Sequence, residues 1–371
     1  MARRLNSDRL LFWATLFLVS VSVVMVFSAS AVQFAGSATG PYVKQAVWAV
    51  LGLALMLIVM RIDYHELRRP AVIWTLLAVT VVALLAVFAF PARKGTHRWI
   101  SFGEVSLQPS ELAKLTALLF TAALLERRMH RINDPAQALL PIGLVAGGLA
   151  GLIVMQPDFG TAAVLLAVIA SVVFAAGLSY RYLVGASLLL APVAMVIVAT
   201  EPYRMRRITA FLDPWADPFD SGYQIVQSLI AVGSGGLVGR GFMAGVQKLF
   251  YIPEPHNDYI FAVIGEELGL LGTSVALCCF AVIAWRGLRT SLLAPDRFGA
   301  LLALGLTMMV TLQAFVNMSV VLAMLPPKGI PLPFVSNGGS SLVVSLVAMG
   351  VLLNISQQAS PAAAAAGEGR G

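Results

Sequence analysis

The chain has 371 residues, of which 59% are hydrophobic and only 12% are charged, and its formal net charge is +7. Soluble globular domains carry about 25% charged residues and about 45–50% apolar ones, so this composition predicts an integral membrane protein and excludes a soluble enzyme. A membrane span needs about 20 mostly apolar residues, so the length accommodates ten spans together with sizeable loops.

Apolar runs with few charges follow one another along most of the chain. Arg3, Arg4 and Arg9 precede the first run, and the positive-inside rule therefore places the amino terminus in the cytoplasm. We predict an all-α polytopic membrane protein with ten transmembrane helices and both termini in the cytoplasm. The expected spans are 10–28, 43–60, 70–90, 109–125, 137–155, 160–178, 181–199, 259–285, 299–325 and 338–355.

The connections between these spans are unequal in length. We expect residues 1–355 to form a single integral membrane domain and residues 356–371 to form a disordered cytoplasmic tail. One large extracytoplasmic loop, 200–258, joins the seventh and eighth helices, and loops of this length are usually functional. The outer segments 91–108 and 326–340 are also unusual in composition, so the chemistry is expected on the outer side.

A first polar cluster precedes and begins the fourth span. It includes Arg98 and the run Q-P-S-E-L-A-K, in which Glu111 and Lys114 lie three residues apart and so share one helix face. One interpretation is a structural ion pair that lets both charges enter the edge of the membrane. The other is that Lys114 also faces a cavity and helps to neutralise an anionic lipid head group.

The long loop carries a second cluster with Arg204, Arg206 and Arg207, followed by a glycine-rich run at 233–241. The glycines do not match the Walker pattern, and nucleotides are cytoplasmic, so we expect close backbone packing or a re-entrant turn there rather than a phosphate loop.

A third cluster, P-E-P-H-N-D-Y, places Asp258 where the loop becomes a span. A carboxylate at a helix start can simply be a cap. Glu266 and Glu267 follow roughly 12 Å further along the helix axis, where buried acids need partners or water. His256 and Asp258 are a weak pattern for a metal site. The fourth cluster, around Asn317 and 326–341, is rich in Pro and Gly, and such irregular backbone must be buried in protein or line a wet cavity.

Four motifs in order resemble the SEDS family (shape, elongation, division and sporulation). They are G-T-H-R-W-I-S-F-G with Q-P-S-E-L-A-K, D-P with G-Y-Q and Q-S, P-E-P-H-N-D-Y-I-F-A-V-I-G-E-E-L-G, and K-G-I-P-L-P-F-V-S-N-G-G-S-S, and the likeness extends from near residue 20 to near residue 355. The runs M-V-F-S-A-S and V-Q-K-L-F-Y are more similar to the cell-division branch than to the elongation branch.

This resemblance implies a ten-span peptidoglycan glycosyltransferase that polymerises lipid II at the outer face of the cytoplasmic membrane, at the division septum. The essential aspartate of the family maps onto Asp258. The chain departs from the family pattern at Asn257 and Tyr259, which are usually Thr and Phe, and at Asn337, which is usually Tyr.

The expected reaction is attack of an acceptor GlcNAc 4-hydroxyl on the anomeric carbon of a donor MurNAc, with inversion. Asp258 would take the proton as the general base, and cations would stabilise the leaving pyrophosphate. For the substrate site, which binds pyrophosphate and sugars, we predict Arg98, Lys114, Glu111, Arg204, Arg206, Arg207, Lys328, Ser336 and Ser340. No cofactor is required by this scheme, although a divalent cation, Mg²⁺ or Mn²⁺, is an alternative carrier of the positive charge.

The resemblance further implies the partners lipid II and the nascent glycan strand, a class B penicillin-binding protein of the FtsI type, and other divisome membrane proteins of the FtsQ, FtsL and FtsB type; no nucleic acid is expected. The alternatives are a lipid II flippase, which would need a polar path to the cytoplasmic leaflet, an elongation polymerase of the RodA type, and a scaffold without catalysis.

Overall fold

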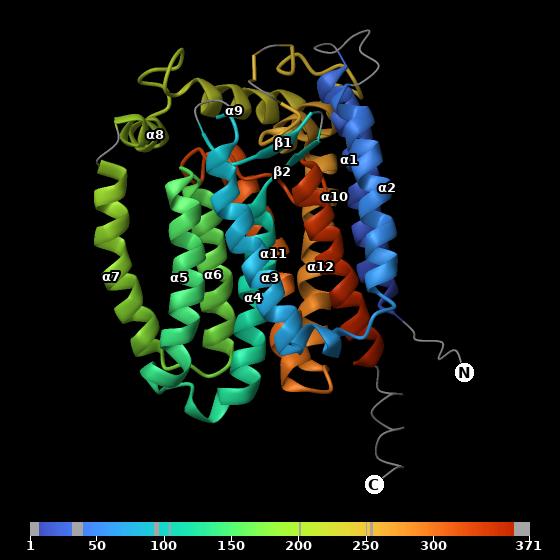
Figure 1. Cartoon of the computed structure of the whole chain (residues 1–371). Helices are drawn as coiled ribbons and strands as arrows, with labels where there is room; N and C mark the ends of the chain where they lie inside the picture. The colour runs from blue at the N-terminus through green and yellow to red at the C-terminus, as the bar shows by residue number, and fades with distance from the viewer. Residues whose placement is uncertain are drawn as a thin grey trace.

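Long helices run side by side in one bundle, with two short strands at one end (Figure 1). The computed structural model describes residues 7–31, 40–92, 96–103, 105–199, 202–249, 251–252 and 255–359. The long helices are α1 (Arg9–Ser30), α2 (Pro41–Val59), α3 (Pro70–Ala86), α4 (Pro109–Arg128), α5 (Leu140–Met155), α6 (Phe159–Ala175), α7 (Tyr180–Ala199), α10 (Ile260–Leu292), α11 (Arg297–Val321) and α12 (Gly339–Gln358).

Each expected span coincides with one of these helices. Among the described residues, seven segments are long and apolar enough to cross a membrane, and they lie on α1, α2, α3, α5, α10, α11 and α12. Helices α6 and α7 provide shorter apolar stretches, Phe159–Ala175 and Tyr180–Val193, while α4 carries charges near both ends. The structure confirms a mostly helical multi-pass membrane protein, and the count of ten spans stays a prediction.

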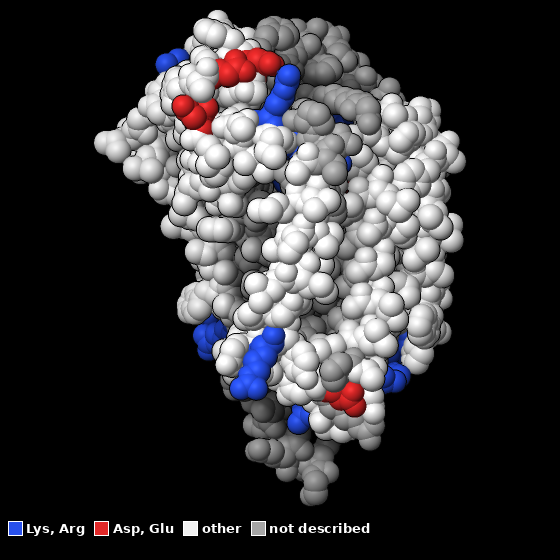
Figure 2. Space-filling model, turned by 90° about the vertical axis from the view of Figure 1, so that its left-hand side faces the viewer, with Lys and Arg blue, Asp and Glu red and all other residues white. Residues whose placement is uncertain are grey.

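The surface charge follows the pattern of a membrane protein. Figure 2 shows Lys, Arg, Asp and Glu at the two ends of one broad side of the molecule, with an uncharged band between them. The described side chains of α7, at the edge of the bundle in Figure 1, are largely exposed and apolar, for example Leu189 and Met195. Apolar side chains on that band are suited to contact with lipid.

Helix α1 begins and α12 ends at the same end of the bundle, which we call the terminal end (Figure 1). The Asp8 N–H donates to Ser356 Oγ at 3.2 Å, and Arg286 Nε of α10 lies 2.5 Å from Asp8 Oδ2. This agrees with termini on one side of the membrane. Helix α12 continues three residues past 355, and residues 360–371 of the expected tail lie outside the described residues.

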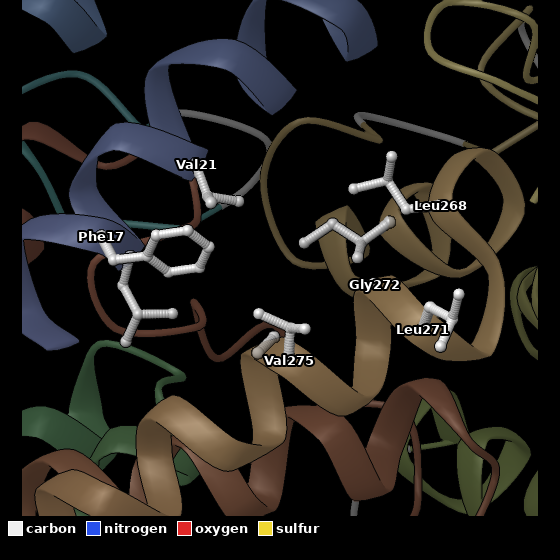
Figure 3. A pocket seen from close by; sticks show the side chains of 9 residues that line it. Phe17, Val21, Leu268, Leu271, Gly272 and Val275 are labelled. Carbon is white, nitrogen blue, oxygen red and sulfur yellow. The ribbon is translucent and has the colours of Figure 1, made fainter. Parts of the chain in front are cut away.

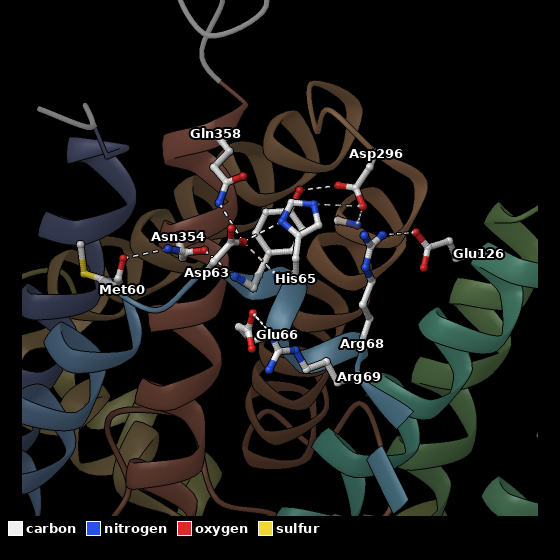
Figure 4. Close-up of polar contacts among 12 residues, drawn as sticks. Met60, Asp63, His65, Glu66, Arg68, Arg69, Glu126, Asp296, Asn354 and Gln358 are labelled. Carbon is white, nitrogen blue, oxygen red and sulfur yellow. Dashed lines mark hydrogen bonds and ion pairs between the residues drawn. The ribbon is translucent and has the colours of Figure 1, made fainter. Parts of the chain in front are cut away.

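The terminal end is closed by polar contacts of the α2–α3 connection, which contains the 3₁₀ helix η1 (Tyr64–Arg68) (Figure 4). The buried Tyr64 donates its N–H to Asn354 Oδ1 of α12 at 3.0 Å and its hydroxyl to Asp296, the N-cap residue of α11. Arg68 pairs with Glu126 of α4 at 2.7 Å. The connection is therefore fastened to three helices.

The opposite end, which we call the loop end, holds two short strands and two shorter helices. Strands β1 (Ile100–Phe102) and β2 (Val105–Leu107) form an antiparallel hairpin with Ile100 opposite Leu107, and Gly103 supplies the positive φ (+58°) of the turn. Helices α8 (Pro202–Leu212) and α9 (Tyr223–Gly235) lie across this end (Figure 1). The long loop 200–258 thus contains two helices of its own. The remaining short helices are η2 (Val87–Ala89), η3 (Met129–Arg131) and the π-helical η4 (Pro135–Leu139).

Helix α10 is interrupted at Gly269, whose φ of +66° is left-handed. The chain that follows α9 docks onto this break: the N–H of Leu270 donates to the Gly236 carbonyl at 2.9 Å, and the N–H of Arg240 donates to the Glu266 carbonyl at 3.0 Å. The break therefore separates a half-helix, Ile260–Leu268, from the rest of α10.

Glycine is required for this docking. A Cβ added at Gly235 would lie 1.9 Å from the Gly265 carbonyl oxygen, and one at Gly239 would lie 2.1 Å from the Glu267 carbonyl oxygen. The glycine-rich run serves close backbone packing, which confirms that alternative over a phosphate loop.

Candidate active site

Asp258 lies at the loop end, in the turn that leads into α10. Helix α10 begins at Ile260, and its N-cap residue Tyr259 makes no side-chain capping bond, so Asp258 stands before the cap position rather than in it. The Asp258 side chain is half-buried and lies against Gly329, where an added Cβ would be 2.7 Å from Asp258 Oδ2. The Asp258 carboxylate therefore lies one residue before the N-cap position and next to the segment that carries Gly329.

Two neighbouring elements hold the backbone of this turn. Asn317 Nδ2 of α11 donates to the Asp258 carbonyl at 2.8 Å and to the Ile330 carbonyl at 2.7 Å. The N–H of Asn337 donates to the His256 carbonyl at 2.9 Å. The turn is thus joined to α11 and to the Pro-rich segment 322–338, and its side-chain carboxylate faces Gly329 of that segment.

Next to Gly329 lies a group of cations that we call the basic cluster: Arg98, Arg204, Arg207 and Lys328, arranged around Asp158 and Phe159. Arg98 donates to the Gln156 carbonyl at 3.2 Å and lies 4.0 Å from Asp158 Oδ1. The guanidinium of Arg204 lies 4.2 Å from the centre of the Phe159 ring, and Lys328 Nζ lies 5.7 Å from the same centre. Arg207 donates to the Pro327 carbonyl at 3.1 Å. Residues far apart in the sequence therefore converge at one place.

The start of α6 positions this cluster. Asp158 is its N-cap residue, and the carboxylate accepts from Thr161 Oγ1 at 2.8 Å and from Gln108 Nε2 at 3.2 Å. Burial lowers the pKa of Lys328 from its ordinary value, the carboxylate of Asp158 acts in the opposite direction, and the arginines of the cluster add to the lowering. In the described part of the chain, four cations thus gather around Asp158, and such a group is suited to binding an anion.

Glu111 and Lys114 are both buried and form an ion pair at 3.0 Å. The predicted pairing is confirmed. Lys114 also donates to Gln313 of α11, whose Nε2 donates to the Pro331 carbonyl at 3.0 Å. These bonds connect α4, through Gln313 of α11, to the segment 322–338. Direct contact of Glu111 or Lys114 with a substrate stays a prediction.

The other predicted substrate residues fall into two groups. Ser336 and Ser340 are buried: Ser336 Oγ accepts from the Leu332 N–H at 2.8 Å, and Ser340 Oγ accepts from the Gln108 N–H at 3.1 Å. Arg206 is exposed on α8 and lies 3.9 Å from Asp220. The structure brings Arg206 to the surface, apart from the contacts that join the basic cluster.

Sequence reasoning missed three residues of this region. Asp158 and Phe159 stand in a short Q-P-D-F-G connection between two apolar runs, where a charged residue at a helix start was an available signal. Lys248 is buried against Glu267 at 2.5 Å. The expectation that Glu266 and Glu267 need partners is confirmed, and Lys248 could have been sought as that partner.

Among the described residues, no group of three or more His, Cys, Asp or Glu side chains converges as a metal site. The pattern of His256 and Asp258 therefore gains no third ligand in this part of the chain, and the role of a divalent cation stays a prediction.

An apolar pocket of about 280 Å³ lies apart from these polar residues, between α1 and α10 (Figure 3). Its walls include Phe17 and Val21 of α1 and Leu268 and Gly272 of α10, on either side of the break at Gly269. The lining offers no group for acid–base chemistry.

Known proteins are similar to this chain over nearly its whole length. The family model FTSW_RODA_SPOVE, described as cell cycle protein, matches residues 9–361. The chain is 42% identical over 355 residues to "Probable peptidoglycan glycosyltransferase FtsW" of Geobacter sp. (strain M18), covering 94% of this chain and 96% of that protein. It is 40% identical over 365 residues to "Stage V sporulation protein E" of Bacillus subtilis (strain 168), covering 96% and 98%.

Solved structures show the same fold. A chain from a structure described as "Structural coordination of polymerization and crosslinking by a peptidoglycan synthase complex" superposes with a TM-score of 0.79 at 30% identity, covering 96% of this chain and 99% of that chain. The rod shape determining protein RodA of Thermus thermophilus superposes with a TM-score of 0.71 at 27% identity, covering 96% and 98%.

Proposed function

The chain belongs to the FtsW, RodA and SpoVE family of cell cycle proteins and is a peptidoglycan glycosyltransferase, and from this premise we propose that Asp258 is the general base with which it polymerises lipid II. One observation supports the assignment most directly. A half-buried carboxylate lies against Gly329, while the adjacent residue, Lys328, belongs to a cluster of four cations. A base and an anion site thus stand side by side at the loop end.

The reaction needs both the base and the anion site. Asp258 accepts the proton of the acceptor GlcNAc 4-hydroxyl as its oxygen bonds to the anomeric carbon of the donor MurNAc. The bond from that carbon to the pyrophosphate oxygen breaks, and undecaprenyl pyrophosphate leaves as an anion that needs no proton. Fixed cations stabilise the charge that develops on the leaving group.

The basic cluster is suited to this anion. Arginine presents a planar fork of donors that matches phosphate oxygens, and lysine adds a point charge. Lys328 carries a proton at a cost because it is half-buried beside other cations. A bound pyrophosphate would offset that cost, so we expect the pKa of Lys328 to rise when substrate binds.

The topology follows from the same assignment. We propose ten spans with both termini in the cytoplasm, which puts the loop end on the outer face of the cytoplasmic membrane, where lipid II is polymerised. The distribution of basic residues supports this orientation. We further propose that the protein acts at the division septum.

The relatives favour the division polymerase over the elongation polymerase, because proteins named FtsW are about 40% identical while RodA is 27% identical. The solved synthase complex couples polymerisation with crosslinking. We therefore propose a class B penicillin-binding protein of the FtsI type as the partner, within an assembly that includes membrane proteins of the FtsQ, FtsL and FtsB type.

The decisive experiment is polymerisation of labelled lipid II by the purified protein with its cognate class B penicillin-binding protein. Asp258→Asn should abolish glycan strands while the protein stays folded. Asp220→Asn is a matched control, because this carboxylate is exposed at the same end of the molecule. Strands of normal length from Asp258→Asn would overturn the assignment of the base.

A further inference from the structure

The consecutive carboxylates Glu266 and Glu267 bind the chain that returns from α9. Both side chains are fully buried in the half-helix Ile260–Leu268. Glu266 accepts the N–H of Val246 at 2.7 Å and of Gln247 at 3.1 Å, and Glu267 accepts the N–H of Met243 at 3.1 Å. The segment 240–249 is thereby fastened along the half-helix.

Lys248 provides the buried counter-charge. Its Nζ lies 2.5 Å from Glu267 Oε1 and donates to Ser28 Oγ of α1 at 2.9 Å, while the Ser28 hydroxyl donates to Glu267 at 2.7 Å. Each of the three side chains is bonded to the other two, and each is at most 2% exposed. We call Lys248, Glu267 and Ser28 the buried triad.

Packing around the triad leaves little freedom. A Cβ added at Gly245 would lie 3.0 Å from a carboxylate oxygen of both Glu266 and Glu267. A buried charge that loses its partner is strongly destabilised, so Lys248 and Glu267 stabilise this arrangement only together.

The break at Gly269 determines what the triad holds. The half-helix is separated from the rest of α10 by a residue outside helical geometry, and it begins two residues after Asp258. The triad therefore holds the half-helix, which follows Asp258 closely in the chain, independently of the long part of α10 that crosses the bundle. From the other side, Asn317 and Gly329 hold the same turn.

We propose that Lys248 is a positioning residue for polymerisation, which acts through Glu267 and Ser28 to keep the Asp258 carboxylate within hydrogen-bond reach of the acceptor hydroxyl. This inference depends on the proposed role of Asp258 as the base. The basic cluster is carried by other elements, with Arg204 and Arg207 on α8, Arg98 just before β1 and Lys328 in the segment 322–338, so loss of the triad affects proton transfer rather than binding of the pyrophosphate.

Loss of the triad should lower kcat much more than it changes KM. A displacement of about 1 Å at a reacting group can lower the rate by about 100-fold. Lys248→Met and Glu267→Gln should each lower kcat for lipid II polymerisation by about 10–100-fold and change KM by less than about threefold. Lys248→Arg, which restores the charge, should recover most of kcat.

The double variant Lys248→Met/Glu267→Gln separates positioning from stability. It removes both buried charges, so its melting temperature should recover relative to the single variants. Its kcat should stay low, because the bonds of Lys248 to Glu267 and Ser28 are still absent. Ser28→Ala, a smaller change, should lower kcat by about three- to tenfold and remains measurable even where Lys248→Met does not fold.

The matched control is Arg286→Gln, which removes an ion pair between the same two helices, α1 and α10, at the terminal end. It should lower the melting temperature and leave kcat unchanged. Recovery of wild-type kcat in the double variant, an effect confined to KM, or an equal loss of kcat in Arg286→Gln would overturn the proposal.

Asp258→Asn, assayed in parallel, distinguishes the two levels of inference. If Asp258→Asn is inactive while the folded Lys248 and Ser28 variants polymerise normally, only the positioning role fails. If Asp258→Asn polymerises like wild type, the assignment of the base fails, and the positioning role falls with it.

Discussion

Asn317 in α11 holds the backbone of Asp258: its side-chain Nδ2 lies 2.8 Å from the Asp258 carbonyl oxygen. The same nitrogen donates to the Ile330 carbonyl at 2.7 Å, one residue beyond Gly329, which contacts the Asp258 carboxylate. One buried amide therefore sets the separation between the turn that carries the proposed base and the segment that carries Lys328.

Asn317→Leu should lower both stability and polymerisation. The substitution keeps the side-chain volume similar and removes the donor from two carbonyls, and each buried polar group left unsatisfied costs about 1–3 kcal/mol. We expect the melting temperature to fall by about 2–6 °C and kcat to fall more than tenfold, measured by thermal unfolding in detergent and by lipid II polymerisation. A stable variant with wild-type kcat would show that the position of Asp258 does not depend on this amide.

Lys328→Met should separate substrate binding from stability. Because burial lowers the pKa of Lys328, the unfolded chain binds more protons than the folded one between the lowered pKa and the ordinary value of 10.5, so this residue makes stability rise with pH in that window. Without substrate, Lys328→Met should therefore melt about 1–3 °C higher than wild type at neutral pH, and the difference should vanish as the pH approaches 10.5.

The same variant should raise KM for lipid II by about tenfold or more, because a charge-assisted hydrogen bond to the pyrophosphate is lost. Lys328→Arg keeps the charge and is the control. An unchanged KM in Lys328→Met would place the pyrophosphate away from this residue.

The sequence was sufficient for the helical architecture and for contacts between neighbours in the chain. Backbone that crosses lipid must satisfy its hydrogen bonds internally, so long apolar runs have few alternatives to a helix, and the expected spans coincide with the observed helices. The motif around Asp258 and the pairing of Glu111 with Lys114 were also accessible, since both depend on neighbours in the chain.

Contacts between distant segments were not accessible. Lys248 donates a hydrogen bond to Ser28 of α1, 220 residues away in the sequence. Arg98 donates to the connection before α6, 58 residues away in the sequence. The break at Gly269 has no local signal either, because a single glycine in the run E-E-L-G also fits an ordinary helix, and its left-handed φ depends on the docked segment after α9. Helices α8 and α9 were also missed, because the composition of residues 200–258 predicts only one long loop.

Tyr64→Phe should destabilise the protein without affecting catalysis. The Tyr64 hydroxyl donates to Asp296 at the terminal end. Burial, together with this hydrogen bond, raises the pKa of Tyr64 far above its ordinary value, so the hydroxyl stays protonated at accessible pH. A hydrogen bond to a charged group contributes about 1.5–3 kcal/mol. The melting temperature should fall by about 2–6 °C with kcat within twofold of wild type, and a large fall in kcat would reveal coupling between the two ends of the bundle.

Gly329→Ala tests the contact between the Pro-rich segment and the proposed base. An added Cβ would lie 2.7 Å from Asp258 Oδ2, closer than such atoms approach, so the carboxylate must move while Gly329 itself is exposed and can accept the methyl group. We expect kcat to fall about 10–100-fold with a melting temperature close to that of wild type. The matched control is Gly338→Ala in the same segment, where the nearest atom, Ser341 Cβ, would lie 3.7 Å away in ordinary contact. Equal kcat values for the two alanine variants would mean that the Asp258 carboxylate does not work from the position against Gly329.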